Sequence, residues 1–349
     1  MNLALIAADE PLNGAAAVTT TNRFPGAPVL LTREIFGSGR LPAGVVINNK
    51  VANVAVPGGL DHARRLTDEL VRLSDRCPWL SLSTGVIGWR LPVDEMLPEL
   101  GALYEDRRPD AGVAVAEAMM TTDRYPKLRR VDLGGGSILG VAKGAGMIEP
   151  NMATMLSVIL TDLALPEDAP QGIWDALLRE SVEGSFNRIG VDGERSTSDV
   201  VVLLSTGSAG TVSVERFRSG LEELTTYLAK EVVRNGEGTA HLIRVEVGGI
   251  GESRRALYLA RRLSSSPLVK SAVYGNDPNV GRILMALGDG LSDLDEPGRQ
   301  ERLTIEIDGV TVFEGGHFLL TPETELSLSE SLRSSAMDPT LRGYPQHQR

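Results

Sequence analysis

The chain has 349 residues, of which 42% are hydrophobic and 23% charged, and its formal net charge is −11. Such a length suits two domains, or one large domain with an ample core. The acidic balance, with no run of Lys or Arg, argues against a nucleic-acid partner. No apolar stretch approaches the ~18 residues of a membrane span, so we expect a protein that binds neither nucleic acid nor membrane.

Cys77 is the only cysteine in the sequence, so no intramolecular disulfide can form. A reducing compartment suits such a chain. Because Cys77 follows an amphipathic segment, we expect a buried structural thiol. The first residues have no basic segment and too short an apolar run for a signal peptide, which predicts a cytoplasmic location.

Strands and helices alternate through the first half of the chain. Hydrophobic periodicity predicts a helix that carries Leu66, Leu70 and Leu73 on one face. A helix of small residues is expected over residues 112–120. Strands are expected at residues 45–48, 129–133 and 138–142. The glycines at 134–136 join the last two strands as a hairpin turn. They do not form a phosphate loop, because no Lys-Ser/Thr pair follows them.

The second half continues the same alternation, which gives a mixed α/β (α+β) fold class. A buried strand is expected at residues 155–160, and the chain after about residue 321 is weakly patterned, which predicts a loosely ordered tail. The other predicted helices cover residues 173–188, 214–234, 252–262 and 281–287. The other predicted strands cover residues 200–204, 242–247, 269–274, 303–307 and 310–313.

The loop KGAGMIEPNMATML, residues 143–156, delivers a hydroxyl residue to the start of the buried strand. Its glycines and its proline permit a sharp, strained path. The Thr154 hydroxyl, held against the carbonyl of Ala153, can attack that carbonyl, and hydrolysis of the resulting ester frees an N-terminal threonine. Its hydroxyl is then a nucleophile and its α-amine, with a reference pKa near ~8, is a general base. From the residues alone, a threonine that merely opens a strand is the alternative.

This loop resembles the autoproteolysis motif of the ornithine acetyltransferase / glutamate N-acetyltransferase family. Other stretches resemble the same family and occur in the right order, so that the resemblance covers most of the chain from about residue 3 to residue 313. They are STGVIG at 83–88, MTTD at 120–123, FNRIGVDGERSTSD at 186–199, NGEG at 235–238 and KSAVYGNDPNVGR at 270–282.

The resemblance implies layered sheets flanked by helices, in an N-terminal-nucleophile-like fold. It implies self-cleavage between Ala153 and Thr154, into an α chain of residues 1–153 and a β chain of residues 154–349. Thr154 would be the nucleophile that carries the acyl group. Thr84, through its hydroxyl, and Gly85, through its backbone N–H, would form the oxyanion hole.

The substrate-binding residues that the resemblance implies are Thr121, Lys143, Thr154 and Glu237. Lys143 would supply a cation for a substrate carboxylate, and Glu237 would hold an amino group or relay a proton. The implied reaction is ping-pong: N-acetylornithine acylates Thr154, and glutamate or a related amine takes the acetyl group. No metal or nucleotide cofactor is implied, although acetyl-CoA is a further candidate donor. The implied partners are small amino acids and other copies of the chain, with αβ units that pair into a heterotetramer.

Both ends look shortened relative to the family, and its C-terminal substrate-contacting Asn and Thr have no counterpart here. Val51 stands where an Asn is usual, and Val280 where a Trp is usual, a substitution that still suits a core position. Two other functions therefore stay open. One is a self-cleaving amidohydrolase or aminopeptidase that uses Thr154 but releases the acyl group to water. The other is a non-catalytic binding paralogue. The preferred donor and acceptor, and the pathway served, do not follow from the sequence.

Overall fold

The computed structural model describes residues 1–149 and 155–337. Two compact units divide the chain, one that ends at Glu237 and one that begins at Gly238. The expected cleavage position, after residue 153, therefore falls inside the first unit. The division into α and β chains stays a prediction.

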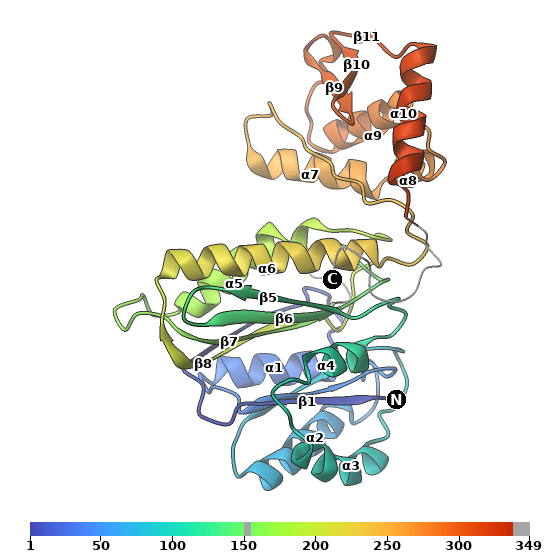
Figure 1. Cartoon of the computed structure of the whole chain (residues 1–349). Coiled ribbons are helices and arrows are strands. Elements are labelled where there is room, and N and C mark those ends of the chain that lie inside the picture. Colours follow the sequence, from blue (N-terminus) through green and yellow to red (C-terminus); the bar gives the residue numbers. More distant parts are fainter. Residues whose placement is uncertain (150–154, 338–349) are drawn as a thin grey trace. The chain divides into compact units, whose positions relative to one another are not determined.

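A five-stranded sheet lies at the centre of the first unit, in the order β2-β8-β7-β6-β5 (Figure 1). β7 and β8 run parallel, with Leu156 opposite Val200, and the other neighbours run antiparallel. The expected hairpin joins β5 to β6. The strands are β2 (Gly14–Thr19), β5 (Lys127–Asp132), β6 (Ser137–Lys143), β7 (Leu156–Ala164) and β8 (Val200–Thr211).

A second, three-stranded sheet has the order β1-β3-β4. β1 is antiparallel to β3, and β3 is parallel to β4. Its strands are β1 (Leu3–Ala7), β3 (Gly44–Asn48) and β4 (Trp79–Ser83). Every residue of β3 and β4 is buried, as expected for strands covered on both faces.

Helices cover both sheets, so that the first unit is a stack of alternating helical and sheet layers (Figure 1). α5 and α6 cover one face of the five-stranded sheet, α1 and α4 lie between the two sheets, and α2 and α3 cover the far face of the smaller sheet. Three hydrophobic clusters fill the spaces between these layers. The helices are α1 (Ala27–Gly37), α2 (Gly59–Ser74), α3 (Val93–Glu105), α4 (Gly112–Met119), α5 (Ile173–Gly184), the 3-10 turn η1 (Phe186–Arg188) and α6 (Val214–Arg234).

The first five residues of β8 are all apolar, because both faces of this strand are buried in the five-stranded sheet. Val201 and Leu203 point into the cluster under α5 and α6, whereas Val200, Val202 and Leu204 point into the cluster between the sheets. Successive side chains of a strand face opposite sides, so both faces of β8 are core. The start of β8 is therefore fixed from both sides.

The second unit combines helices with a small antiparallel sheet in the order β11-β10-β9. Two hydrophobic clusters hold it together, and Val280 is buried in one of them. Its elements are α7 (Ser253–Ser265), α8 (Pro267–Tyr274), α9 (Val280–Asp293), the 3-10 turn η2 (Gln300–Arg302), β9 (Thr304–Ile307), β10 (Val310–Glu314), β11 (His317–Phe318) and α10 (Pro322–Ser335).

Two predictions of secondary structure in this unit are wrong. Residues 269–274 belong to α8, which Ser266 caps by accepting a hydrogen bond from the N–H of Val269, with Pro267 in the first turn. Residues 242–247 do alternate in burial, and Val245 and Val247 pack on a hydrophobic cluster. However, no strand in the described part of the chain pairs with them, so no strand forms.

The loosely ordered tail from about residue 321 is also a wrong prediction, as far as residue 335. α10 begins there, capped by the Thr321 hydroxyl, which accepts from the N–H of Thr324. Leu328 is buried in a hydrophobic cluster of the second unit. Short polar helices gain most of their stability from such tertiary contacts, and a sequence pattern does not report those contacts.

Candidate active site

The turn after β4 holds the two residues expected to form an oxyanion hole. Thr84 is buried and its N–H donates to the carbonyl of Asn48, whereas Gly85 is exposed. Gly85 has φ +132°, and a Cβ there would lie 2.1 Å from the carbonyl carbon of Lys50. Only glycine fits this backbone. Among the described residues the Gly85 N–H has no acceptor, so it is available to an incoming oxygen.

Lys143 ends β6 and meets this turn from the other sheet. Its Nζ donates to Thr84 Oγ1 at 3.0 Å, and both side chains are buried. The Thr84 oxygen is thereby an acceptor for Lys143, which leaves the hydroxyl proton to donate elsewhere. Burial lowers the pKa of Lys143, and the nearby carboxylates of Asp123, Asp199 and Glu237 partly oppose this.

Asp123 ties together two loops that border the site. Its carboxylate accepts from Lys127 Nζ at 2.5 Å, from the N–H of Gly144 at 2.8 Å and from the N–H of Thr121 at 2.9 Å. The Asp123 and Lys127 side chains are both fully buried. Burial alone would raise the pKa of Asp123, but Lys127, Lys143 and these hydrogen bonds hold it well below its ordinary value.

Two expected substrate-binding residues, Thr121 and Glu237, lie exposed beside these loops. Glu237 accepts from the Thr122 hydroxyl at 2.6 Å, and its own N–H donates to the carbonyl of Ala145 at 2.7 Å. The Glu237 carboxylate lies close to Gly146, where an added Cβ would come within 2.7 Å of it. Three motifs that lie far apart in sequence, at 120–123, 143–146 and 235–238, therefore converge.

A further carboxylate, that of Asp199, lies at the start of β8. It is fully buried and accepts from the N–H of Met155 at 2.8 Å. Burial raises its pKa to about 8, against the lowering effect of this N–H, of the Ser196 hydroxyl and of the Lys143 charge. Thr154 and Ala153, the expected nucleophile and cleavage position, lie outside the described residues.

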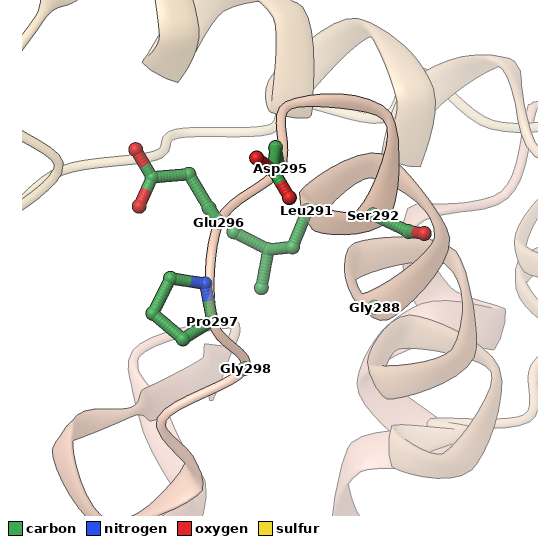
Figure 2. A pocket seen from close by; sticks show the side chains of 7 residues that line it. All are labelled: Gly288, Leu291, Ser292, Asp295, Glu296, Pro297 and Gly298. Carbon is green, nitrogen blue, oxygen red and sulfur yellow. The ribbon is translucent and has the colours of Figure 1, made fainter.

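A hollow of about 440 Å³ lies elsewhere, in the second unit, between the end of α9 and the segment after it (Figure 2). None of the residues expected at the active site lines it. One of its acidic side chains, Glu296, already forms an ion pair with Arg255. Within residues 1–149 and 155–337, no group of three or more His, Cys, Asp or Glu could hold a metal ion.

Cys77 is exposed, which corrects the expected buried thiol, and its Sγ accepts a hydrogen bond from Arg40 at 2.9 Å. The residue lies in a surface turn between α2 and β4, after the apolar face of α2 has ended. Val280 is buried, which confirms that valine suits a core position there, and Val51 is buried as well. In the described part of the chain, no helix has the length and apolar character to cross a membrane.

The profile of the ArgJ family matches residues 1–339. The chain belongs to the ArgJ family. Its members include the arginine biosynthesis bifunctional protein ArgJ of Thermus thermophilus, which is 38% identical over 320 residues, covering 90% of this chain and 80% of the relative. The glutamate N-acetyltransferase Oat2 of Streptomyces clavuligerus is also 38% identical, over 301 residues, covering 85% of this chain and 75% of the relative.

Among solved structures, an ornithine acetyltransferase complexed with ornithine from Mycobacterium tuberculosis matches at 30% identity and a TM-score of 0.36. It covers 43% of this chain and 82% of its own. The family membership itself rests on the profile and on these two relatives, and it confirms the resemblance inferred from the motifs.

Sequence reasoning missed the buried charges that support the ArgJ site. Asp123, Lys127 and Asp199 were not among the expected site residues. Asp123 and Asp199 each end a stretch that resembled the family, at 120–123 and 186–199, and that position was the available signal. Which backbone groups they bind is visible only in the structure.

Proposed function

We propose that this ArgJ-family chain is an N-acetyltransferase of arginine biosynthesis that moves an acetyl group from N-acetylornithine to glutamate or a related amine. The acyl carrier is Thr154, freed by self-cleavage after Ala153. The hydrogen bond between Lys143 and Thr84 carries this proposal, because it joins the ends of two sheets beside the Gly85 N–H, to which no described residue offers an acceptor. A hydroxyl and a backbone N–H at one turn are the donors that an acyl-transfer oxyanion needs.

Self-cleavage needs no outside reagent except water. The Thr154 oxygen adds to the carbonyl carbon of Ala153, the C–N bond between the two residues breaks, and the hydroxyl proton ends on the new α-amino group. Water then adds to the ester, so that Ala153 gains a carboxyl group and Thr154 regains its hydroxyl.

Acetyl transfer repeats this chemistry on the substrate amide. The Thr154 oxygen attacks the acetyl carbon of N-acetylornithine, the amide C–N bond breaks, and the hydroxyl proton passes through the α-amine to the departing ornithine nitrogen. The amine of glutamate then attacks the acetyl ester and returns one proton to Thr154. Thr84 and Gly85 stabilise the oxyanion in both halves. Lys143, Thr121 and Glu237 bind the substrate's charged and polar groups.

Several accompanying features belong to the same proposal. The reaction uses no metal or nucleotide cofactor, and acetyl-CoA is a further donor to be assayed. The αβ units pair into a heterotetramer that acts in the cytoplasm. The oligomeric state is measured by light scattering coupled to size-exclusion chromatography.

Intact mass under denaturing conditions tests the proposal. The wild type, incubated with N-acetylornithine, should give two fragments, with one acetyl group on the fragment that begins at Thr154. Thr154→Ala should stay full-length and unmodified. An uncleaved wild type that gains no adduct would overturn the proposal.

The effect of adding the acetyl acceptor glutamate distinguishes acetyl transfer from hydrolysis. If the enzyme is a transferase, release of ornithine from N-acetylornithine should rise with added glutamate, and N-acetylglutamate should accumulate. Free acetate in equal amount with and without glutamate would instead identify an amidohydrolase that uses the same Thr154.

A further inference from the structure

Asp199 is a buried carboxylate to which the proposed reaction assigns no role. It directly precedes β8, which is one of the two parallel strands of the five-stranded sheet. Its Oδ1 accepts from the N–H of Met155 at 2.8 Å. Its Oδ2 accepts no hydrogen bond of ordinary geometry from the described residues, although the Ser196 hydroxyl is near enough to lower the pKa of the carboxyl. Burying such a group is costly, which calls for an explanation.

The surroundings of Asp199 make it a rigid anchor. Its carbonyl accepts from the N–H of Thr20, just past β2, at 2.9 Å, and the next residue, Val200, donates its N–H to the carbonyl of Met155 at 3.2 Å. Met155 is therefore held on its N–H by the Asp199 side chain and on its carbonyl by the β8 backbone. Hydrophobic clusters on both faces of β8 keep this strand in place.

The nitrogen that Asp199 holds is covalently joined to residue 154. The Met155 amide nitrogen is bonded to the carbonyl carbon of Thr154, so that a hydrogen bond to this N–H fixes the peptide on one side of the nucleophile. Self-cleavage breaks the peptide on its other side. Displacement of a reacting group by about 1 Å costs roughly 100-fold in rate, so a fixed peptide here matters for both reactions.

We propose that Asp199 is the positioning residue for Thr154, and that it holds the Thr154–Met155 peptide through the Met155 N–H during self-cleavage and acetyl transfer. This inference rests on the proposed function. It explains why a carboxyl group is kept at a fully buried position. Above its pKa of about 8 the side chain is a carboxylate, and a carboxylate binds an N–H about twice as strongly as a neutral acceptor does.

The test measures the rate of self-cleavage in variants that weaken or remove the side-chain acceptor of the Met155 N–H. Each chain is made by cell-free synthesis, and loss of the full-length form is followed by denaturing electrophoresis. Asp199→Ala, which has no acceptor, should cleave about 100-fold more slowly than the wild type. At about pH 9, where Asp199 is ionised, Asp199→Asn keeps only a neutral acceptor and should fall between the two, at about one tenth of the wild-type rate. Melting temperatures are measured on the same proteins.

Asp162 supplies a matched control. It lies on β7, at the other end from Met155, and its carboxylate accepts from the N–H of Ser137 at 2.7 Å. Asp162→Ala therefore removes the same kind of bond from the same strand. It should cleave at the wild-type rate even where its melting temperature falls, which separates positioning from general stability.

Each outcome decides one of the two proposals. If the wild type cleaves and Asp199→Ala cleaves equally fast, the positioning role is overturned and the proposed function is left intact. If Asp199→Ala does not fold, Asp199→Asn decides: a wild-type rate overturns the role, and slow cleavage at an unchanged melting temperature supports it. A wild type that never cleaves overturns the proposed self-cleavage, and the positioning role falls with it.

Discussion

Lys143 is the residue around which the charges of the site are arranged. It is buried, bonded to Thr84, and surrounded by the carboxylates of Asp123, Asp199 and Glu237. A buried cation is tolerated when an anion lies nearby, and Asp123, whose pKa is held well below its ordinary value, supplies one. Lys143 thus links the oxyanion turn to the loop that carries Asp123.

A substitution of Thr84 that keeps the side-chain shape tests the oxyanion hole. Thr84→Val keeps the side-chain volume but removes the hydroxyl, and loss of one such donor costs about 100-fold to 1,000-fold in kcat. Thr84→Ser, which keeps the hydroxyl, should retain most of the activity. Both are measured as steady-state release of ornithine from N-acetylornithine. A kcat for Thr84→Val close to that of the wild type would remove Thr84 from the oxyanion hole.

Asp199 gives the stability of the protein a distinctive pH dependence. Its pKa is about 8 when folded, against an ordinary value of 3.8, so between these values the folded chain holds a proton that the unfolded chain has lost. Its contribution to stability is therefore complete below about pH 4 and is lost as the pH rises to about 8, by at most about 1.4 kcal/mol per pH unit. Asp123 has its pKa shifted the other way, so its contribution is lost only as the pH falls below its ordinary value.

The measurement compares urea unfolding midpoints at about pH 5 and about pH 8 for Thr154→Ala with and without Asp199→Asn. The first protein should lose more stability across this range than the second. Lys143, whose pKa burial lowers, acts in the opposite direction but is present in both proteins, so the difference isolates the carboxyl. Equal losses would show that Asp199 does not titrate in this range.

At the scale of elements, the turn after β4 depends on its backbone more than on its side chains. Gly85 has positive φ and no room for a Cβ beside Lys50. Gly88 also has positive φ, in the same turn, but a Cβ there would meet nothing within 4 Å. A side chain at either position would be strained by the positive φ, but only a side chain at residue 85 would also clash with the Lys50 backbone.

Gly85→Ala should therefore be far more harmful than Gly88→Ala. Positive φ costs about 1 kcal/mol or somewhat more in both variants, whereas the clash at Gly85 must also move the turn and its N–H. A displacement of about 1 Å should lower kcat roughly 100-fold for Gly85→Ala alone. Melting temperature and kcat are measured together. Equal effects of the two substitutions on kcat would contradict the requirement for glycine at residue 85.

At the scale of the whole molecule, the strand order decides what happens after self-cleavage. In the central sheet, β2, β6 and β5 precede residue 153, and β7 and β8 follow it. The sheet order β2-β8-β7-β6-β5 places the later pair between earlier strands, with hydrogen bonds on both sides. The two products are therefore parts of one sheet and one core.

The fragments should accordingly stay together until the protein unfolds. Native size-exclusion chromatography of the cleaved enzyme should give one peak that contains both residues 1–153 and residues 154–349. Denaturing electrophoresis of that peak should give two bands. Separation of the fragments under native conditions would contradict the shared sheet.

The sequence by itself determined the family, the alternation of strands and helices in the first unit, and the loop that carries Thr154. These are local signals: apolar periodicity, the hairpin glycines at 134–136 and ordered motifs. It failed at residues 269–274 and 322–335, where caps and buried contacts such as Leu328 outweigh a weak local pattern. Residues 242–247 show the reverse case, since a strand-like alternation forms no strand without a neighbour to pair with.

Only the tertiary structure decided how the motifs cooperate. Asp123 and Asp199 act on backbone N–H groups of other segments, at Gly144 and Met155. Such bonds join residues more than twenty positions apart, so no spacing in the sequence predicts them. The interleaving of the strands before and after residue 153 is likewise a property of sheet order, which depends on non-local pairing rather than on any single segment.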